Sequence, residues 1–341
     1  MEKVNLLVAT SSQNYINQAL DELRAYDKTL AVVKNTGNGI MIVRPSVDKH
    51  DFNDILLDNK PIFIRHINTV DYSMDVSLLK EEKYAKTMLE PYLSSIHTED
   101  KLAVQIRMLN SKISMETAEI RNMVDSCISK ETGVIPVVKE PDKIMSIFIA
   151  DEACYIGMSK AEKNISGWSG GMVHYKKSDE DISRAKFKLM EAIYVFNIDM
   201  SSIRRALDLG ASPGGWTSVL LEKGIEVTAV DTGELDDRLF KYPQLTFIKG
   251  NAAELKLPND SFDLLTSDIS WNAVNTAKMV LKCSDTLKSG GLAVVTVKLM
   301  SSKVTRIIKD VKKIYDEAFY IMGIRQLFHN RDEVTMYMKK R

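Results

Sequence analysis

Two kinds of hydrophobic spacing alternate along this chain of 341 residues, and they predict a different organisation for each half. In residues 1–75 the apolar positions predict a strand, a helix, two strands, a helix and a strand, in that order. Asn-Thr-Gly-Asn-Gly at residues 35–39 separates the two central strands and is typical of a hairpin. The N-terminal segment is therefore predicted to form a small α+β unit.

The β-α-β-β-α-β order of residues 1–75 is that of a ferredoxin-like unit, and residues 76–160 are predicted to form a second α+β domain. Helical spacing covers Glu82–Ile96 and Ser114–Lys130. Strand-length apolar runs lie at residues 102–109, 133–139, 144–150 and 154–160. His50 and His66 are isolated, and a hydrogen-bonded structural histidine is the simplest interpretation of each.

Residues 161–180 are predicted to be a linker, because glycine, serine and charged residues dominate and no regular period survives. This segment interleaves aromatic residues with lysines: Trp168, His174, Tyr175, Lys176 and Lys177. Such residues could stack on bases and contact phosphates. Packing of Trp168 and Tyr175 between domains explains them equally well.

Residues 181–341 alternate strand-length apolar runs with segments of helical spacing. The strand runs lie at residues 206–210, 227–231, 245–251, 262–268, 292–298, 317–324 and 333–340. Because helices separate most of these runs, we predict a Rossmann-like α/β domain. Its core would be a seven-stranded, doubly wound sheet with helices on both faces.

A glycine-rich turn follows the first of these strands, in the sequence RALDLGASPGGW at Arg205–Trp216. Gly210, Gly214 and Gly215 allow a sharp turn and a close approach of a ligand to the backbone. Pro213 suits a loop or a first helical turn, and free amides at the start of the next helix would favour an anionic group. The turn therefore predicts a nucleotide-type site, although neither the G-x-G-x-x-G nor the phosphate-loop spacing is present.

The residues that end the apolar runs are polar: Asp208, Asp231, Asn251, Asp268 and Lys298. In a doubly wound sheet these ends share the carboxyl edge, where ligands bind. Asp231, about twenty residues after the glycine turn, is placed to accept hydrogen bonds from the ribose hydroxyls of an adenosine. Asn251 could accept from the adenine amine, or could simply be a turn residue.

Two lysines and two carboxylates are predicted to converge on the same cleft, namely Lys188, Asp268, Lys298 and Glu333. Such a group suits proton abstraction from a weakly acidic hydroxyl, provided that one lysine is neutral. Lys298 follows a buried run directly and is the candidate base.

Composition adds few constraints. Lys plus Arg and Asp plus Glu are both 46, so the net charge is zero and does not itself indicate a polyanionic partner. The three cysteines lie far apart, which predicts neither disulfides nor a metal site. With no signal peptide pattern and no apolar run of membrane-spanning length, we expect a cytoplasmic protein without membrane contact. As a separate expectation, the protein is a monomer.

The motif D-x-G-x-x-P-G-G-W resembles motif I of the FtsJ/RrmJ-like methyltransferases, and the order Lys188, Asp268, Lys298, Glu333 resembles their catalytic tetrad. The segments FKLMEAIYVF, VDTGEL and RQLFHNRDEVTMYMKKR are similar to the RlmM type of 23S rRNA methyltransferase. The hairpin at residues 144–160 resembles the end of a THUMP domain, an RNA-binding module.

This resemblance implies an S-adenosylmethionine-dependent enzyme that methylates the ribose 2′-hydroxyl of a cytidine in 23S rRNA. It implies a methyltransferase domain over residues 181–341, a THUMP-like domain over 76–160 and a ferredoxin-like domain over 1–75. The implied cofactor-binding residues are Asp208, Gly210, Pro213, Gly214, Gly215, Trp216, Asp231, Asn251 and Asp268. The sequence departs from the family at Asn251, where many relatives are acidic, and at Ile269–Asn272, which lacks a usual proline.

The basic positions of residues 303–313 recur every three or four residues and predict an amphipathic helix. Its basic face could dock phosphates or could simply be solvated. Two other functions stay open from the sequence: methylation of tRNA or another rRNA site, and a non-catalytic role in RNA binding or ribosome assembly. The intact tetrad favours an enzyme, because a binding module has no need of it.

Overall fold

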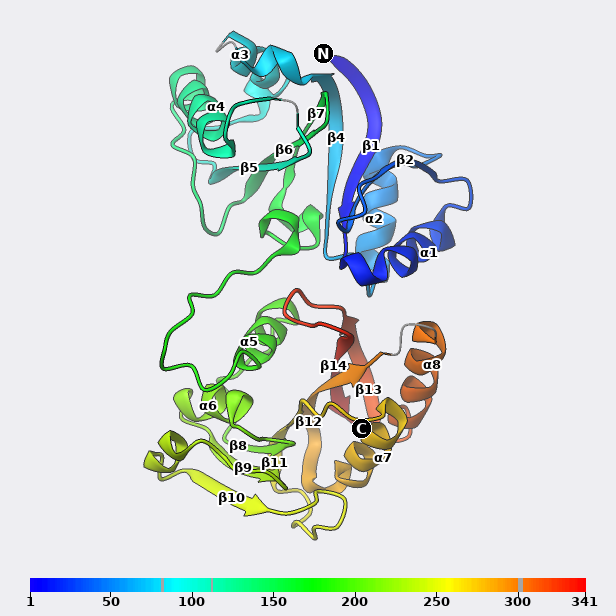
Figure 1. The fold of residues 1–341 in the computed structure, drawn as a ribbon, viewed down its shortest axis with the longest axis vertical. Helices are drawn as coiled ribbons and strands as arrows, with labels where there is room; N and C mark the ends of the chain where they lie inside the picture. Colours follow the sequence, from blue (N-terminus) through cyan, green and yellow to red (C-terminus); the bar gives the residue numbers. More distant parts are fainter. Residues whose placement is uncertain (81–82, 112, 300–302) are drawn as a thin grey trace. The chain divides into compact units, whose positions relative to one another are not determined.

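The computed structural model describes residues 1–80, 83–111, 113–299 and 303–341, and the chain forms two compact units, Met1–Met172 and Val173–Arg341 (Figure 1). Each unit is built on a seven-stranded sheet. The α/β class predicted from the sequence is confirmed.

The first unit follows the order of elements predicted from the hydrophobic spacing. Its first six elements are β1 (Glu2–Thr10), α1 (Ile16–Tyr26), β2 (Ala31–Asn35), β3 (Ile40–Arg44), α2 (Lys49–Asn59) and β4 (His66–Asp75). The next five are α3 (Lys83–Leu89), β5 (Leu102–Leu109), α4 (Thr117–Thr132), β6 (Lys143–Ala150) and β7 (Ala153–Lys160). Short 3₁₀ turns connect several of them.

One sheet runs through the whole of the first unit, in the order β2-β3-β1-β4-β7-β6-β5. Strand β4 pairs with β1 on one side and with β7 on the other, so residues 1–75 and 76–160 share it. Apolar residues of β5, β6 and β7 pack with α3 and α4 in a single core on one face of the sheet. This core lies within the second half of the unit apart from Tyr72 and Met74 of β4, so the pairing of β4 with β7 is what joins that half to the first.

Two predicted elements of this unit differ in the structure. The predicted strand at residues 133–139 is irregular, because Pro136 has no N–H to donate and only Val137 N donates to β5, at Leu102 O. Ile135 and Val138 are correspondingly 81% and 77% exposed. The helix predicted over residues 82–96 becomes 3₁₀ at Glu90–Ser95, where Pro91 interrupts the α-helical hydrogen bonding. Glu82 itself lies outside the described residues.

The second unit contains the seven strands predicted from the sequence. Its elements are α5 (Lys186–Val195), β8 (Arg205–Leu209), α6 (Gly215–Glu222), β9 (Glu226–Asp231), β10 (Leu245–Lys249), β11 (Phe262–Ser267), α7 (Ala273–Lys282), β12 (Leu287–Lys298), α8 (Val304–Tyr315), β13 (Phe319–Arg325) and β14 (Glu333–Lys340). The sheet order is β10-β9-β8-β11-β12-β14-β13. Strands β8 to β12 are parallel, whereas β14 is antiparallel to both of its neighbours.

Helices cover both faces of this sheet, with α5 and α6 on one side and α7 and α8 on the other (Figure 1). Apolar residues of α5 and α6 form one core cluster with β8 and β9. On the other side α8 buries Val304, Ile308, Val311 and Tyr315. Its basic residues Lys303, Arg306, Lys309, Lys312 and Lys313 are all exposed, so the predicted amphipathic helix is confirmed.

The segment predicted as a linker is largely packed against one unit or the other. Thr10 Oγ1 donates to Gly170 O and Gln105 Nε2 donates to Gly167 O, which fixes its first part on the sheet of the first unit. Within the second unit, Tyr175 stacks on Phe187 of α5. Within the described parts of the chain, no helix has the length and apolar character that crossing a membrane requires.

Gly157 of β7 allows a close strand contact and generates a stability prediction. A Cβ at this position would lie 1.9 Å from Thr69 O of β4, whereas a Cβ at Gly167 would meet nothing within 4 Å. We expect Gly157→Ala to lower the free energy of unfolding by about 1–3 kcal/mol, because β4 and β7 must move apart. Gly167→Ala is the matched control and should change it little. Equal urea midpoints for the two variants would contradict the close packing described here.

Candidate active site

Five polar residues gather at the carboxyl edge of the second sheet. Because β8 to β12 are parallel, their C-terminal ends lie along the same edge. The sequence-predicted residues at those ends are Asp208, Asp231, Asn251, Asp268 and Lys298. The glycine turn between β8 and α6 lies at this edge as well.

The glycine turn has backbone angles that require glycine. Gly210 has φ +74° and Gly214 has φ +115°, both in the left-handed region. A Cβ on Gly210 would lie 2.2 Å from Ile269 Cγ1, and one on Gly214 would lie 2.2 Å from Leu239 Cδ1. Pro213 precedes this glycine pair. Trp216 lies in the core, where its indole N–H donates to Ala185 O at 2.9 Å, so its side chain fixes α6 against the segment before α5.

Asp208 is a buried carboxylate whose two oxygens have hydroxyl donors. Oδ2 accepts from Thr217 Oγ1 at 2.6 Å, and Oδ1 accepts from Thr266 Oγ1 at 2.9 Å. Burial raises the pKa of Asp208 to about 7, although the two hydroxyls favour the charged form. The side chain thus joins β8 to α6 and β11 directly beneath the glycine turn.

Asp231 faces the glycine turn, and Asn251 is held within its own turn. The Asp231 carboxylate accepts from Ser212 N at 2.9 Å and from Gly233 N at 2.7 Å. It therefore braces the turn while keeping lone pairs for further donors. Asn251 is exposed; its Oδ1 accepts from Ala253 N and its Nδ2 donates to Glu254. These contacts correspond to the turn role that the sequence left open.

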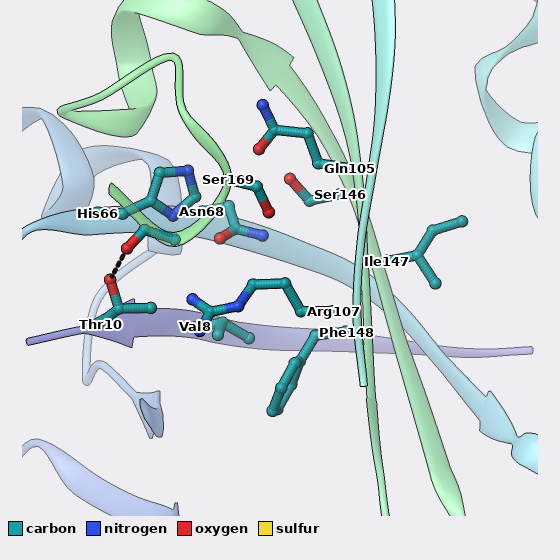
Figure 2. Close-up of a pocket in the computed structure, with 11 residues that line it drawn as sticks. Val8, Thr10, His66, Asn68, Gln105, Arg107, Ser146, Ile147, Phe148 and Ser169 are labelled. Carbon is teal, nitrogen blue, oxygen red and sulfur yellow. Dashed lines mark hydrogen bonds between the residues drawn. The ribbon is translucent and has the colours of Figure 1, made fainter. Parts of the chain in front are cut away.

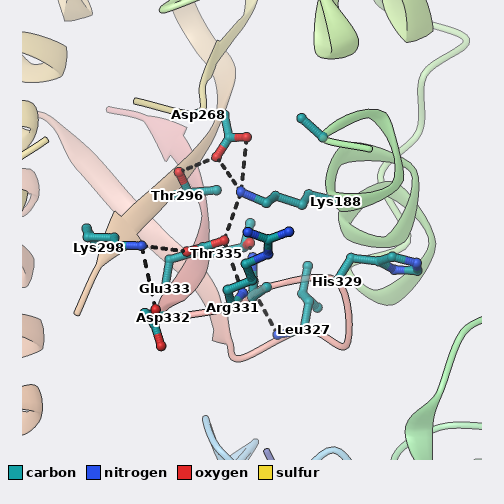
Figure 3. Close-up of polar contacts among 12 residues, drawn as sticks. Lys188, Asp268, Thr296, Lys298, Leu327, His329, Arg331, Asp332, Glu333 and Thr335 are labelled. Atoms are coloured by element: carbon teal, nitrogen blue, oxygen red, sulfur yellow. Dashed lines mark hydrogen bonds and ion pairs between the residues drawn. The ribbon is translucent and has the colours of Figure 1, made fainter. Parts of the chain in front are cut away.

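The four residues of the predicted tetrad lie together (Figure 3). Lys188 Nζ, from α5, lies 3.1 Å from Asp268 Oδ1 and 2.8 Å from Glu333 Oε1. Lys298 Nζ, at the end of β12, lies 3.6 Å from Glu333 Oε2. Thr296 Oγ1 donates to Asp268 Oδ1 at 2.8 Å, a contact that the sequence did not reveal.

The two lysines of this cluster have different surroundings. The Lys188 side chain is 17% exposed, and burial alone would lower its pKa, but Asp268 and Glu333 together raise it. Burial raises the pKa of Asp268 despite its pairing with Lys188. For Glu333 the effect of burial is outweighed by Lys188, and its pKa is lowered. Lys188 is therefore held as an ammonium between two acids.

Lys298 is held less tightly. Its side chain is 38% exposed, and its two carboxylate neighbours, Glu333 and Asp332, lie 3.6 Å and 3.9 Å away. Lys298 and Glu333 are also direct partners in the ladder between β12 and β14. The backbone pairing thus sets this lysine beside one acid while leaving part of the side chain open to solvent.

Glu191 supports the site and was not identified from the sequence. It is 2% exposed on α5 and accepts from Phe328 N at 2.7 Å and His329 N at 2.8 Å. His329 Nδ1 also lies 2.8 Å from Glu191 Oε2. Glu191 therefore fixes the loop that leads to Glu333. The available signal was its position three residues after Lys188, on the same face of a helix.

Known protein families and relatives match parts of this chain. The model of the FtsJ-like methyltransferase family matches residues 182–321. The chain is 29% identical over 217 residues to the ribosomal RNA large subunit methyltransferase M of Pseudomonas entomophila, covering 58% of each protein. It is 30% identical over 206 residues to the protein of that name from Psychromonas ingrahamii, covering 56% of this chain and 55% of that protein. The chain thus matches these curated relatives over less than two thirds of their length.

Solved structures give weaker likenesses. TrmN from Thermus thermophilus is 12% identical, covers 98% of this chain and 99% of its own, and aligns with a TM-score of 0.40. A putative hemolysin from Lactococcus lactis is 19% identical, covers 48% of this chain and 90% of its own, and aligns with a TM-score of 0.42. These TM-scores are too low for either likeness to bear on function.

The Glu191 contacts generate a stability prediction. In Glu191→Gln a single side-chain oxygen remains where two oxygens accept from two backbone N–H groups. We expect the free energy of unfolding to fall by about 1.5–3 kcal/mol, because one buried donor loses its charged acceptor. Glu222→Gln, at an exposed position of α6, should leave it unchanged. A Glu191→Gln protein as stable as the Glu222→Gln control in urea would show that the contacts are dispensable.

The raised pKa of Asp208 generates a pH prediction. Its pKa is about 7 in the folded protein against an ordinary value of 3.8, so the folded state binds this proton more tightly than the unfolded state. Stability due to this group therefore falls as the pH rises from about 4 to about 7. Asp208→Asn does not titrate, so its free energy of unfolding should rise relative to the wild type over that range. Asp237→Asn, an exposed control, should track the wild type. Parallel curves for Asp208→Asn and the wild type would argue against the shift.

Proposed function

The chain contains an FtsJ-like methyltransferase domain, and on this basis we propose that it is an S-adenosylmethionine-dependent RNA ribose 2′-O-methyltransferase. Its substrate in this proposal is a cytidine of 23S rRNA. The relatives named as large-subunit ribosomal RNA methyltransferases support the choice of rRNA. The tetrad at the carboxyl edge supports the choice of a hydroxyl as the group that loses a proton.

The residues at this edge fit S-adenosylmethionine, which when bound supplies an electrophilic methyl group. The carboxylate of Asp231 has two oxygens, each with one backbone donor, and can accept two further bonds from the ribose hydroxyls. The turn containing Gly210, Pro213, Gly214 and Gly215 lies beside this carboxylate, because Ser212 N of the turn donates to Asp231. Asp208 and Trp216 hold that turn in shape from beneath, and Asp268 and Asn251 flank it.

Lys298 is the general base of the proposed mechanism. A neutral Lys298 amine would accept the proton of the ribose 2′-hydroxyl, which leaves the 2′-oxygen as the nucleophile. Lys188 cannot take this role while Asp268 and Glu333 hold its proton. The difference between the two lysines is the observation that carries the assignment.

The other three members of the tetrad position the base. Lys188 neutralises the pair of buried acids, which would otherwise repel each other. Glu333, fixed by Lys188, in turn holds the amine of Lys298 at the end of β12. A preorganised base removes part of the entropic cost of aligning the reacting groups.

RNA binding is proposed for two further regions. The exposed basic face of α8 could contact backbone phosphates near Lys298 in the chain. Residues 1–75 and 76–160 are proposed as a ferredoxin-like and a THUMP-like domain that bind the same RNA, and residues 161–180 as the segment connecting them to the methyltransferase domain at 181–341. The enzyme is proposed to act as a cytoplasmic monomer without a metal ion.

The mechanism predicts the effect of replacing the base. Lys298→Arg keeps a positive charge, but a guanidinium does not give up its proton at working pH. We expect the single-turnover rate of RNA methylation to fall about 10²–10⁴-fold, the usual share of general base catalysis. Binding of cofactor and RNA, measured by calorimetry, should change little.

One matched control variant completes this experiment. Lys223→Arg, at an exposed position after α6, should keep the wild-type rate. A Lys298→Arg enzyme with a near-normal single-turnover rate would overturn the base assignment.

The RNA target is tested separately, by mapping 2′-O-methylation in total RNA from a strain that lacks the gene and from its parent. Loss of one 23S rRNA cytidine mark is expected, and loss of a tRNA mark instead would refute that choice of substrate.

A further inference from the structure

A polar pocket lies on the sheet of the first unit, whereas the residues of the proposed methyltransferase site belong to the second unit (Figure 2). It is lined by strands β1, β4, β5 and β6 and by the segment at Ser169 and Gly170. His66, Gln105, Arg107 and Ser146 surround the space, as Figure 2 shows. The alternate residues of β5 and β6 belong to the apolar core with α3 and α4. The pocket therefore opens on the opposite face of the sheet from that core.

The pocket contains buried polar groups without partners. Both ring nitrogens of His66, Nη1 of Arg107 and the hydroxyl of Ser146 have no hydrogen-bond partner. His66 is only 3% exposed, so water outside the protein cannot compensate. The structure thus corrects the interpretation of His66 as a hydrogen-bonded structural histidine. Unpaired buried polar groups are rare in folded proteins and call for a ligand or an ordered water.

The charge of Arg107 distinguishes a bound ligand from an ordered water molecule. Within the described residues no carboxylate pairs with Arg107, and burial lowers the pKa of its guanidinium. Burial and the nearby Arg107 charge lower the pKa of His66 to about 3, so its ring is neutral and offers one N–H donor. A water molecule could satisfy the hydrogen bonds but would not neutralise the positive charge of the partly buried guanidinium. An anion satisfies both.

The segment at Ser169 and Gly170, which lines the pocket, leaves room for the Arg107 side chain. Gly170 has φ +63°, and a Cβ there would lie 1.8 Å from Arg107 Nη1. The carbonyls of this segment are already used, since Gly167 O accepts from Gln105 and Gly170 O accepts from Thr10. Of the unpaired atoms in the pocket, Arg107 Nη1, the Ser146 hydroxyl and one His66 nitrogen can donate, whereas Gln105 Oε1 can only accept.

We propose that this pocket binds a phosphate group through the Arg107 guanidinium, the Ser146 hydroxyl and the His66 N–H. Donors on three different strands surround the space, which suits an oxyanion with several acceptor atoms. The pocket is narrow and partly open, so one or two phosphate oxygens enter it and the rest of the ligand stays outside. The same chemistry could come from free inorganic phosphate or from a phosphodiester of RNA.

The first experiment measures thermal unfolding of the full chain with inorganic phosphate, at an ionic strength held constant with sodium chloride. Phosphate should raise the melting temperature of the wild type and of Arg24→Gln, an exposed control on α1. It should not raise that of Arg107→Gln. Without phosphate, Arg107→Gln should melt at the wild-type temperature or above, because it removes an unpaired buried charge. A clearly lower melting temperature, or an unchanged response to phosphate, would overturn the proposal.

A second measurement needs no variant. The ring nitrogen resonances of His66 in the ¹⁵N-labelled wild type should shift on addition of the ligand. A shift with inorganic phosphate alone identifies the free anion as the source. A shift with single-stranded RNA, together with an RNA affinity about ten-fold weaker in Arg107→Gln, identifies a phosphodiester. No shift with either ligand would refute the site. None of these readouts depends on methyl transfer, so the proposal can fail independently of the enzyme assignment.

Discussion

The ammonium group of Lys188, shared between Asp268 and Glu333, is the interaction on which the second unit's candidate site depends. The three residues come from a helix, the end of β11 and the start of β14. Strand β12 lies between these two strands in the sheet. The two carboxylate side chains are only 14% and 6% exposed, so without Lys188 the buried Asp268 would lose its cationic partner and Glu333 the nearer of its two. The Lys188 ammonium thus joins three elements and offsets the free-energy cost of burying the two carboxylates.

The antiparallel strand β14 gives the two lysines of this cluster different surroundings. Its insertion between β12 and β13 makes Glu333 the ladder partner of Lys298. Glu333 therefore contacts a tightly held lysine on one side and a loosely held lysine on the other. The asymmetry arises from where the sheet ends and from solvent access, since the two side chains are chemically identical.

The sequence was sufficient for features that depend on local pattern. The strands from residue 206 onward, the glycine turn and the convergence of Lys188, Asp268, Lys298 and Glu333 follow from periodicity, spacing and family resemblance. The sequence was insufficient where a partner distant in the chain determines the local structure. Residues 133–139 have strand character, but their backbone finds one ladder bond instead of a series. The residues next to Glu191 and His66 in the sequence do not indicate which of the two is fully hydrogen-bonded and which has no partner.

The loop before β14 is attached to α5 at two points, by Glu191 near its middle and by Lys188 at its end. These two residues are three positions apart on one helix, about 4.5 Å along its axis. The distance between Lys188 and Glu191 along α5 therefore limits how many residues can lie between the two attachment points of the loop, at residues 328–333. Insertions or deletions within residues 328–333 are therefore expected to be rare in evolution, because a change in length would break one of the two attachments.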